Sequence, residues 1–112
     1  LVMKITITSR HFKAHSSLND YAEAAVQHLT KYYDGIVKAE VILQFEKARN
    51  SSKIAEINLS VYNAVLTGQA ATADFFKSID AASGKLTAQL KKYKERLHGR
   101  DRILVRRVRE KI

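Results

Sequence analysis

Residues 74–98 constrain the fold most, because they have the apolar spacing of one long amphipathic helix. At about 100° per residue, the large apolar side chains return to one side of this helix, as expected of a helix that packs on a core. These side chains are Phe75, Ile79, Ala82, Leu86, Leu90, Tyr93 and Leu97. Asp74 precedes the first of them and is predicted to cap the N-terminus. The pattern therefore predicts a long helix docked on a hydrophobic core.

The same helix carries a separate row of cations, formed by Lys85, Lys92 and Arg96. They lie within about 40° of each other and roughly 110° from the middle of the apolar stripe. They border the buried face and can point together at one ligand. A simpler explanation is that Lys and Arg near a helix C-terminus complement the helix dipole and keep the surface soluble.

The charge of the whole chain favours a polyanionic ligand. There are 20 Lys and Arg against 11 Asp and Glu, which leaves a net charge of +9 on 112 residues and a pI near 9.9. Such an excess indicates nucleic acid or an anionic surface as the partner.

The rest of the chain predicts strands around a second helix. Residues 3–9, 36–48 and 55–61 alternate apolar and polar side chains, as strands with one buried face do, and residues 65–72 form a weaker strand. The second and third of these strands should form an antiparallel hairpin. The earlier helix should begin at Ser17, whose spacing to Asp20 resembles a capping box, and end at Gly35.

These elements give an α+β fold class, a single β-α-β-β-β-α domain with a four-stranded sheet. Both helices are predicted to pack on one face of the sheet, because each strand has only one clearly apolar side. The other face should remain wet and relatively acidic. Its polar residues are Glu40, Gln44, Glu46, Glu56 and Asn58. We therefore expect RNA contacts from helices and loops rather than from the sheet.

The length and the 46% apolar composition fit one compact domain, which we assign to residues 1–98, followed by a basic tail at residues 99–112. The tail contains six cations, Arg100, Arg102, Arg106, Arg107, Arg109 and Lys111. Its spacing fits a helix or a strand. A mobile tail and a segment that becomes ordered on RNA or a partner both remain open.

Several classes of function lack their residues in this sequence. With no Cys, there is no disulfide framework and no sulfur-ligated metal. No stretch approaches the roughly 18 consecutive apolar residues of a membrane span, and no signal peptide is visible, so a cytoplasmic protein is expected. His11 and His15 lie in a loop without a metal motif, and no Gly-rich nucleotide loop is present. We expect a binding protein, with no enzyme activity, cofactor, metal or small-molecule substrate.

The chain resembles a known family in several segments. The strand MKITITSRHF, the helix SSLNDYAEAAVQHLTKYYDGI, the strand VILQFEK and above all DFFKSIDAASGKLTAQLKKYKERL are similar to the ribosome hibernation promoting factors, also called ribosome-associated sigma-54 modulation proteins. The similarity runs over about residues 3–98. It implies a double-stranded-RNA-binding-like domain that occupies the decoding region of the small ribosomal subunit and blocks messenger RNA and tRNA in starved or stationary cells. Because no second domain follows, we expect a short form.

The resemblance also implies which cations contact ribosomal RNA. Matched to the basic helix of the family, the contacts would be Lys85, Lys92, Lys94 and Arg96, with Lys91 as an additional cation. Around the strand ends, further candidates are Arg10, Lys13, Lys47, Arg49 and Lys53, for which an ordinary solvated charge is an equal explanation. The alternative function, suggested by the older family name, is a protein-interaction regulator of an alternative sigma factor.

Overall fold

The computed structural model describes residues 3–48, 50 and 52–110, with side chains described as far as residue 97. Six elements follow one another along the chain. They are β1 (Lys4–Arg10), α1 (Ser16–Leu29), β2 (Lys38–Glu46), β3 (Ser52–Val61), β4 (Ala64–Thr72) and α2 (Phe75–Glu110). The predicted β-α-β-β-β-α order is confirmed.

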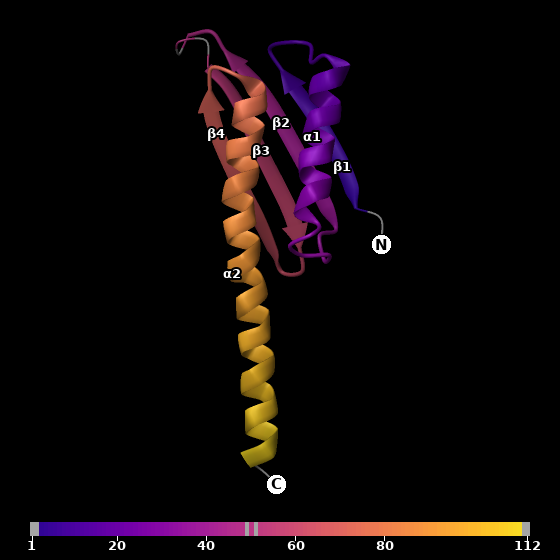
Figure 1. Ribbon diagram of the computed structural model, residues 1–112, viewed down its shortest axis with the longest axis vertical. Coiled ribbons are helices and arrows are strands. Elements are labelled where there is room, and N and C mark those ends of the chain that lie inside the picture. Colours follow the sequence, from indigo (N-terminus) through magenta and orange to yellow (C-terminus); the bar gives the residue numbers. More distant parts are fainter. Residues whose placement is uncertain (1–2, 49, 51, 111–112) are drawn as a thin grey trace.

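The four strands form one mixed sheet in the order β1-β2-β3-β4. β1 pairs parallel with β2, because α1 carries the chain back between them, whereas β2 pairs antiparallel with β3 and β3 with β4. The predicted hairpin is therefore confirmed. α1 and α2 lie side by side and run in the same direction (Figure 1). β1 and β4 are the two edges of the sheet.

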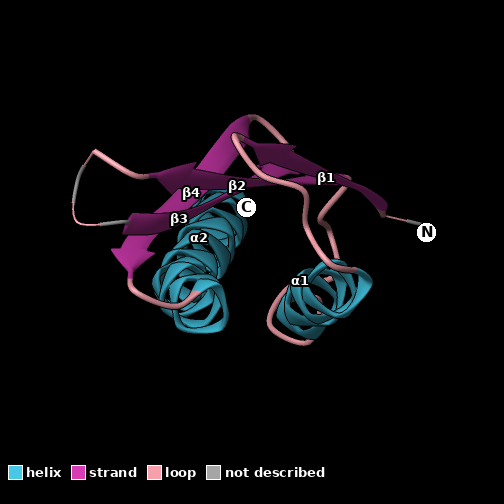
Figure 2. Cartoon of the chain, turned by 90° about the horizontal axis from the view of Figure 1, so that it is seen from above, coloured by secondary structure: helices cyan, strands magenta, loops and turns pink. Residues whose placement is uncertain are grey.

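Both helices cover the same face of the sheet, as predicted (Figure 2). On that face the central strands contribute seven buried side chains: Ala39, Val41 and Leu43 from β2, and Ala55, Ile57, Leu59 and Val61 from β3. Opposite them, the helices bury Val26, Leu29, Ile79, Leu86 and Leu90. The single core therefore lies between one sheet face and two helix stripes, and the other sheet face is left without a covering layer.

The start of α1 differs from the prediction. The N-cap is His15 rather than Ser17, and its Nδ1 accepts the backbone N–H of Ser17 at 3.3 Å. Ser17 thus lies inside the first turn, and the expected capping box with Asp20 is wrong. The buried stripe of α1 consists of Leu18, Ala22, Val26 and Leu29, whereas Ala25 is only partly buried.

α2 begins as predicted and ends later than expected. The side chain of Asp74 accepts the backbone N–H of Phe76 at 2.9 Å, which is the geometry of an N-cap. The stripe from Phe75 to Leu90 is buried in the core. The helical backbone continues through Gly99 to Glu110, past the end of the sheet (Figure 1). Residues 99–110 therefore extend α2, and the domain boundary between residues 98 and 99 stays a prediction.

Replacing Asp74 with Ala should lower the free energy of unfolding by about 1 kcal/mol, because the backbone N–H of Phe76 loses its acceptor and the N-terminus of α2 loses a nearby negative charge. Asp74→Asn should restore most of this loss, since Asn also caps helices. Urea denaturation followed by circular dichroism measures both. Asp20→Ala, at a carboxylate that caps no helix, is the control and should change stability by less than about 0.5 kcal/mol. Equal stability of Asp74→Ala and the unmodified protein would contradict the cap.

Candidate nucleic-acid interface

The predicted row of cations on α2 follows the free edge of β4. Lys85 Nζ donates to the carbonyl oxygen of Gln69 at 2.5 Å, and Gln89 Nε2 donates to the carbonyl oxygen of Thr67 at 2.8 Å. Both donors occupy the same helix face, four residues apart. They bind outward carbonyls of an edge strand, which protects that edge from pairing with another chain. Gln89 was not recognised in the sequence, where nothing marks it as an edge cap.

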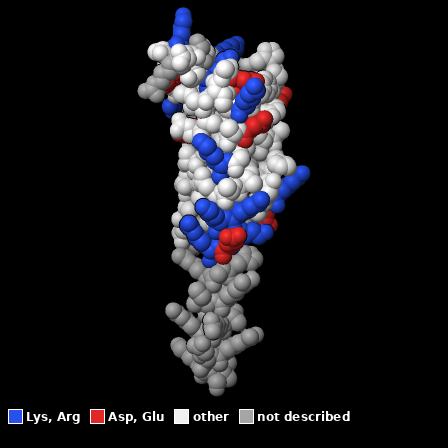
Figure 3. Space-filling model, turned by 60° about the vertical axis from the view of Figure 1, so that its left-hand side comes forward, with Lys and Arg blue, Asp and Glu red and all other residues white. Residues whose placement is uncertain are grey.

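Lys92 and Arg96 continue this row beyond the last strand contact. Both side chains are exposed, and among the described side chains neither forms a hydrogen bond or an ion pair. Between them, the Tyr93 hydroxyl donates to the carbonyl oxygen of Tyr62 at 2.5 Å, which fixes α2 against the β3–β4 turn. Cations gather over this end of the described surface (Figure 3). The structure therefore presents Lys92 and Arg96 freely and holds Lys85 to the strand.

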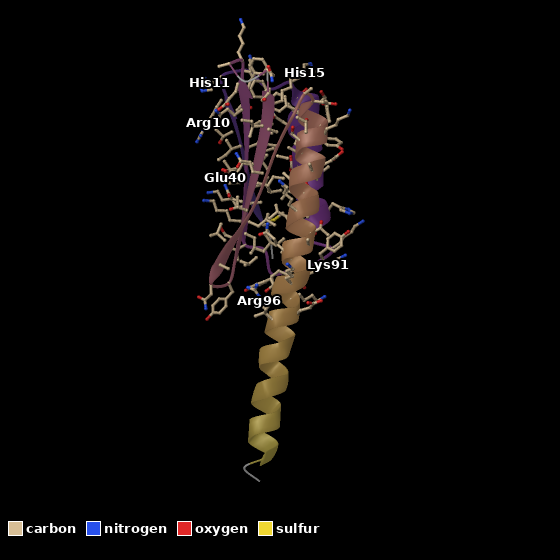
Figure 4. The ribbon with its side chains drawn as sticks, turned by 90° about the vertical axis from the view of Figure 1, so that its left-hand side faces the viewer. Arg10, His11, His15, Glu40, Lys91 and Arg96 are labelled. Carbon is tan, nitrogen blue, oxygen red and sulfur yellow. The ribbon has the colours of Figure 1, made fainter. Side chains whose placement is uncertain are left out.

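The other two predicted cations of α2 lie on its opposite flank. Lys91 Nζ lies 5.4 Å from the centroid of the Tyr32 ring, within the range of a cation–π interaction. Lys94 lines a surface hollow at the end of α1 together with Lys31, which the sequence did not single out. In Figure 4, Lys91 and Arg96 point to different sides of α2. The five predicted helix cations thus form two separate surfaces.

The remaining predicted contacts lie at the far end of the sheet. Arg10 lies at the end of β1, well away from Arg96 (Figure 4), and its open-face partner in β2 is Gln44. Lys13 and Lys47 are exposed in the loops after β1 and β2. Arg49 lies outside the described residues. The structure brings none of the described ones next to the cation row.

Tyrosines connect the two helices and hold α2 in place. The Tyr33 and Tyr93 rings meet edge to face with centroids 5.4 Å apart, and burial followed by the neighbouring Tyr93 raises the pKa of Tyr33. Tyr21 donates its hydroxyl to Asp80 Oδ1 at 2.5 Å; this hydrogen bond, followed by partial burial, raises the pKa of Tyr21 above its ordinary value. The cation row therefore lies on a helix whose position is fixed by side-chain contacts, rather than on a loop.

The uncovered face of the sheet is mixed in charge rather than acidic: Glu40 and Glu56 lie near its centre, and Lys4, Arg10 and Lys38 lie on the same face. Asn58 Nδ2 donates to Glu56 Oε2 at 3.2 Å and reaches Glu40 Oε1 at 3.5 Å, while Asn58 Oδ1 accepts from Thr67 at 2.7 Å. Figure 4 shows Glu40 on this face, pointing away from both helices. The two carboxylates near Asn58 disfavour a phosphate at the centre of this face, whereas the cation row attracts one.

In the described part of the chain, no three His, Asp or Glu side chains are grouped closely enough to hold a metal ion. The described helices also include none that is both long and apolar enough to cross a membrane.

Comparison with known proteins places the chain in a family. The family model described as "Sigma 54 modulation protein / S30EA ribosomal protein" matches residues 5–98, which is most of the chain. The chain belongs to this family. The matched residues include all of β1 except its first residue, the remaining strands, α1 and the basic part of α2.

Members of the family that are similar to this chain include proteins from several bacteria. The ribosome hibernation promoting factor of Pseudomonas putida is 29% identical over 94 residues, covering 84% of this chain and 89% of that protein. The factor of the same name from Azotobacter vinelandii is 30% identical, covering 84% and 85%, respectively. The factor from Escherichia coli K12 is 28% identical, covering 85% and 97%.

Solved structures agree with this assignment. A ribosomal subunit interface protein from Coxiella burnetii superposes with a TM-score of 0.74 at 25% identity, covering 82% of this chain and 98% of that one. The N-terminal domain of Thermus thermophilus Protein Y superposes with a TM-score of 0.72 at 25% identity, covering 80% and 98%. The family and the fold are therefore established together.

Proposed function

We propose that this protein is a ribosome hibernation factor that occupies the decoding region of the small ribosomal subunit and blocks messenger RNA and tRNA in starved or stationary cells. Support comes from the family match over residues 5–98 and from relatives named as ribosome hibernation promoting factors. Its partner would be the ribosome, and its place of action the cytoplasm, where ribosomes work.

The observation that carries this proposal is the pair of unpartnered cations, Lys92 and Arg96, on a helix braced against the sheet. Folded RNA offers phosphates and shape, because its deep major groove is closed to side chains. Cations at fixed positions supply affinity for those phosphates, and the outline of the fold supplies placement. Glu40 and Glu56 lie on the opposite, uncovered face of the sheet, away from these two cations.

Inhibition in this proposal requires binding alone. A domain held in the decoding region excludes messenger RNA and tRNA by occupying their space, so no bond is made or broken. The residues that matter are those that set affinity and orientation. In this proposal α2 supplies that affinity through the cations that it holds at fixed positions.

Sucrose-gradient co-sedimentation with purified ribosomal subunits, in the presence of excess unstructured RNA, tests the proposal. The protein should migrate with the small subunit at near-physiological salt despite the competitor, and messenger RNA added first should reduce its binding. Release by the competitor would mean general polyanion binding. Co-migration with the large subunit alone would contradict decoding-region occupancy.

The family description also supports a second candidate, a regulator of an alternative sigma factor. Such a partner would need exposed apolar surface, and Val37, Tyr62 and Val65 are 67%, 74% and 64% exposed near one end of the sheet. Absence of the protein from both subunit fractions, together with saturable binding to a purified sigma factor, would favour this function over the first.

A further inference from the structure

Tyr62 is the most exposed large apolar residue in the described part of the chain, at 74% of its surface. It lies in the turn between β3 and β4, beside Asn63, whose backbone has a positive φ of 62°. Within the described residues its ring contacts no other aromatic ring and no cation. The Tyr62 ring does not pack in the core, so it contributes little to stability and is available to a ligand.

The packing of α2 on β4 brings the free cations to this turn. Lys85 is bonded at Gln69 and Gln89 at Thr67, so four residues of helix run alongside two residues of strand. Four residues of the helix rise about 6 Å and two residues of the strand about 7 Å, so the helix and the strand advance together. Lys92 and Arg96 follow Gln89 on the same side of α2, three and seven residues further along the helix and close to Tyr93 in sequence. The Tyr93 hydroxyl on the Tyr62 carbonyl anchors this register.

We propose that Tyr62, Lys92 and Arg96 form a binding site for an unpaired RNA nucleotide, with the base stacked on the Tyr62 ring and the adjoining phosphates on the two cations. This site rests on the proposed function and specifies part of it. Proteins that bind single-stranded nucleic acid combine these two elements, an aromatic platform for bases and cations that follow the backbone.

The surroundings of Tyr62 favour an unpaired nucleotide over other occupants. A duplex hides the faces of its bases in the stack, so it could engage the two cations but not the ring. A protein partner would have to cover Lys92 and Arg96 along with Tyr62, and lysine is depleted in the cores of protein interfaces because burying an unpaired ammonium is costly. Unpaired RNA satisfies the ring and both charges at once.

A fluorescent reporter tests stacking directly. The chain contains no Trp, so Tyr62→Trp introduces a single indole whose emission reports its own surroundings. Titration with a single-stranded RNA of about ten nucleotides should quench this emission strongly, because a stacked base contacts the ring. Inorganic polyphosphate, which offers charge without bases, and a blunt RNA duplex should leave it nearly unchanged. Equal quenching by polyphosphate would overturn the stacked arrangement.

Affinity variants test the energetic contribution. Tyr62→Ala should weaken binding of the same single-stranded RNA by about tenfold at fixed salt, as loss of one stacked base does. The salt dependence should stay the same, because no charge is removed. Tyr62→Phe should bind like the unmodified protein. Val65→Ala, at a neighbouring side chain that is 64% exposed, is the matched control and should also bind normally.

Unchanged affinity of Tyr62→Ala for the single-stranded RNA would overturn the site. If the same variant bound ribosomal subunits more weakly, Tyr62 would contact a protein instead. The gradient experiment with the unmodified protein is independent of both. A tenfold loss for the oligomer in Tyr62→Ala would support the nucleotide site even if the unmodified protein failed to bind small subunits, so failure of the function and failure of the site are distinguishable.

Discussion

Replacing Lys85, Lys92 and Arg96 together with Ala should weaken binding to the small ribosomal subunit by about 100-fold near physiological salt. The expectation comes from counterion release, in which each lost phosphate contact reduces the slope of log affinity against log salt by about 0.9. The two free cations, Lys92 and Arg96, account for about 1.5 powers of ten between 0.15 M and 1 M salt, and Lys85 supplies the smaller remainder. Fluorescence anisotropy of labelled protein at several salt concentrations measures the affinity and the slope.

The structure predicts that the three cations contribute unequally. Lys92 and Arg96 form no hydrogen bond or ion pair among the described side chains, so their double replacement should account for most of the loss and for a slope change of about two contacts. Lys85 donates to the Gln69 carbonyl, so Lys85→Ala alone should change affinity little. Equal losses for all three single variants would contradict this division.

A control with the same change in charge separates local contact from net charge. Lys4, Lys38 and Lys77 are exposed cations away from the row, on β1, β2 and the first turn of α2. Their replacement with Ala lowers the net charge equally, and it should change affinity by no more than about threefold. If the control lost as much affinity as the row variant, binding would depend on overall charge and the α2 interface would be excluded.

The elements with strong periodicity could be predicted from the sequence. Ile79, Leu86 and Leu90 are fully buried, because an amphipathic helix removes its apolar side from water by packing that side on the core. The alternation in β2 and β3 likewise required one buried face and placed both helices there. These features depend on spacing within one element, which sequence alone contains.

The division of the cations could not be predicted in the same way. A helical projection places Arg96 and Lys94 on opposite borders of the stripe, but it does not say that one border faces β4 and the other faces α1. That choice depends on strand order and on contacts between segments far apart in sequence, such as Tyr93 with Tyr62. The position of Tyr62, in the β3–β4 turn next to α2, depends on the same contact and could not be predicted from spacing within one element.

The start of α1 and the end of α2 could not be predicted from the sequence pattern either. Ser17 and His15 both offer a side-chain acceptor near the start of α1, and the turn geometry selects His15. At Gly99 the composition changes, yet the backbone remains helical to Glu110. One Gly costs a helix only about 1 kcal/mol, and the Arg and Leu residues after it are good helix formers. The change in composition at Gly99 therefore does not coincide with the end of the helix.

Gly68→Ala should lower the free energy of unfolding by about 2 kcal/mol, whereas Gly84→Ala should raise it by about 1 kcal/mol. A Cβ on Gly68 would lie 2.5 Å from the backbone carbonyl oxygen of Ala82, and the helix backbone cannot yield as a flexible side chain can. A Cβ on Gly84, on the exposed side of the same helix, would meet nothing within 4 Å and would only improve helix propensity. Thermal unfolding followed by circular dichroism should show melting shifts of opposite sign, of about 10 °C and 5 °C.

The Gly68 variant also tests how the fold positions the interface. Gly68 lies between Thr67 and Gln69, whose carbonyls are bound by Gln89 and Lys85, so any separation of α2 from β4 lengthens both hydrogen bonds. The same movement would shift Lys92 relative to the β3–β4 turn. Gly68→Ala should therefore weaken binding of single-stranded RNA at temperatures where it remains folded, and Gly84→Ala should not. A destabilised Gly68→Ala protein that bound RNA normally would mean that the cations bind RNA without help from the β3–β4 turn.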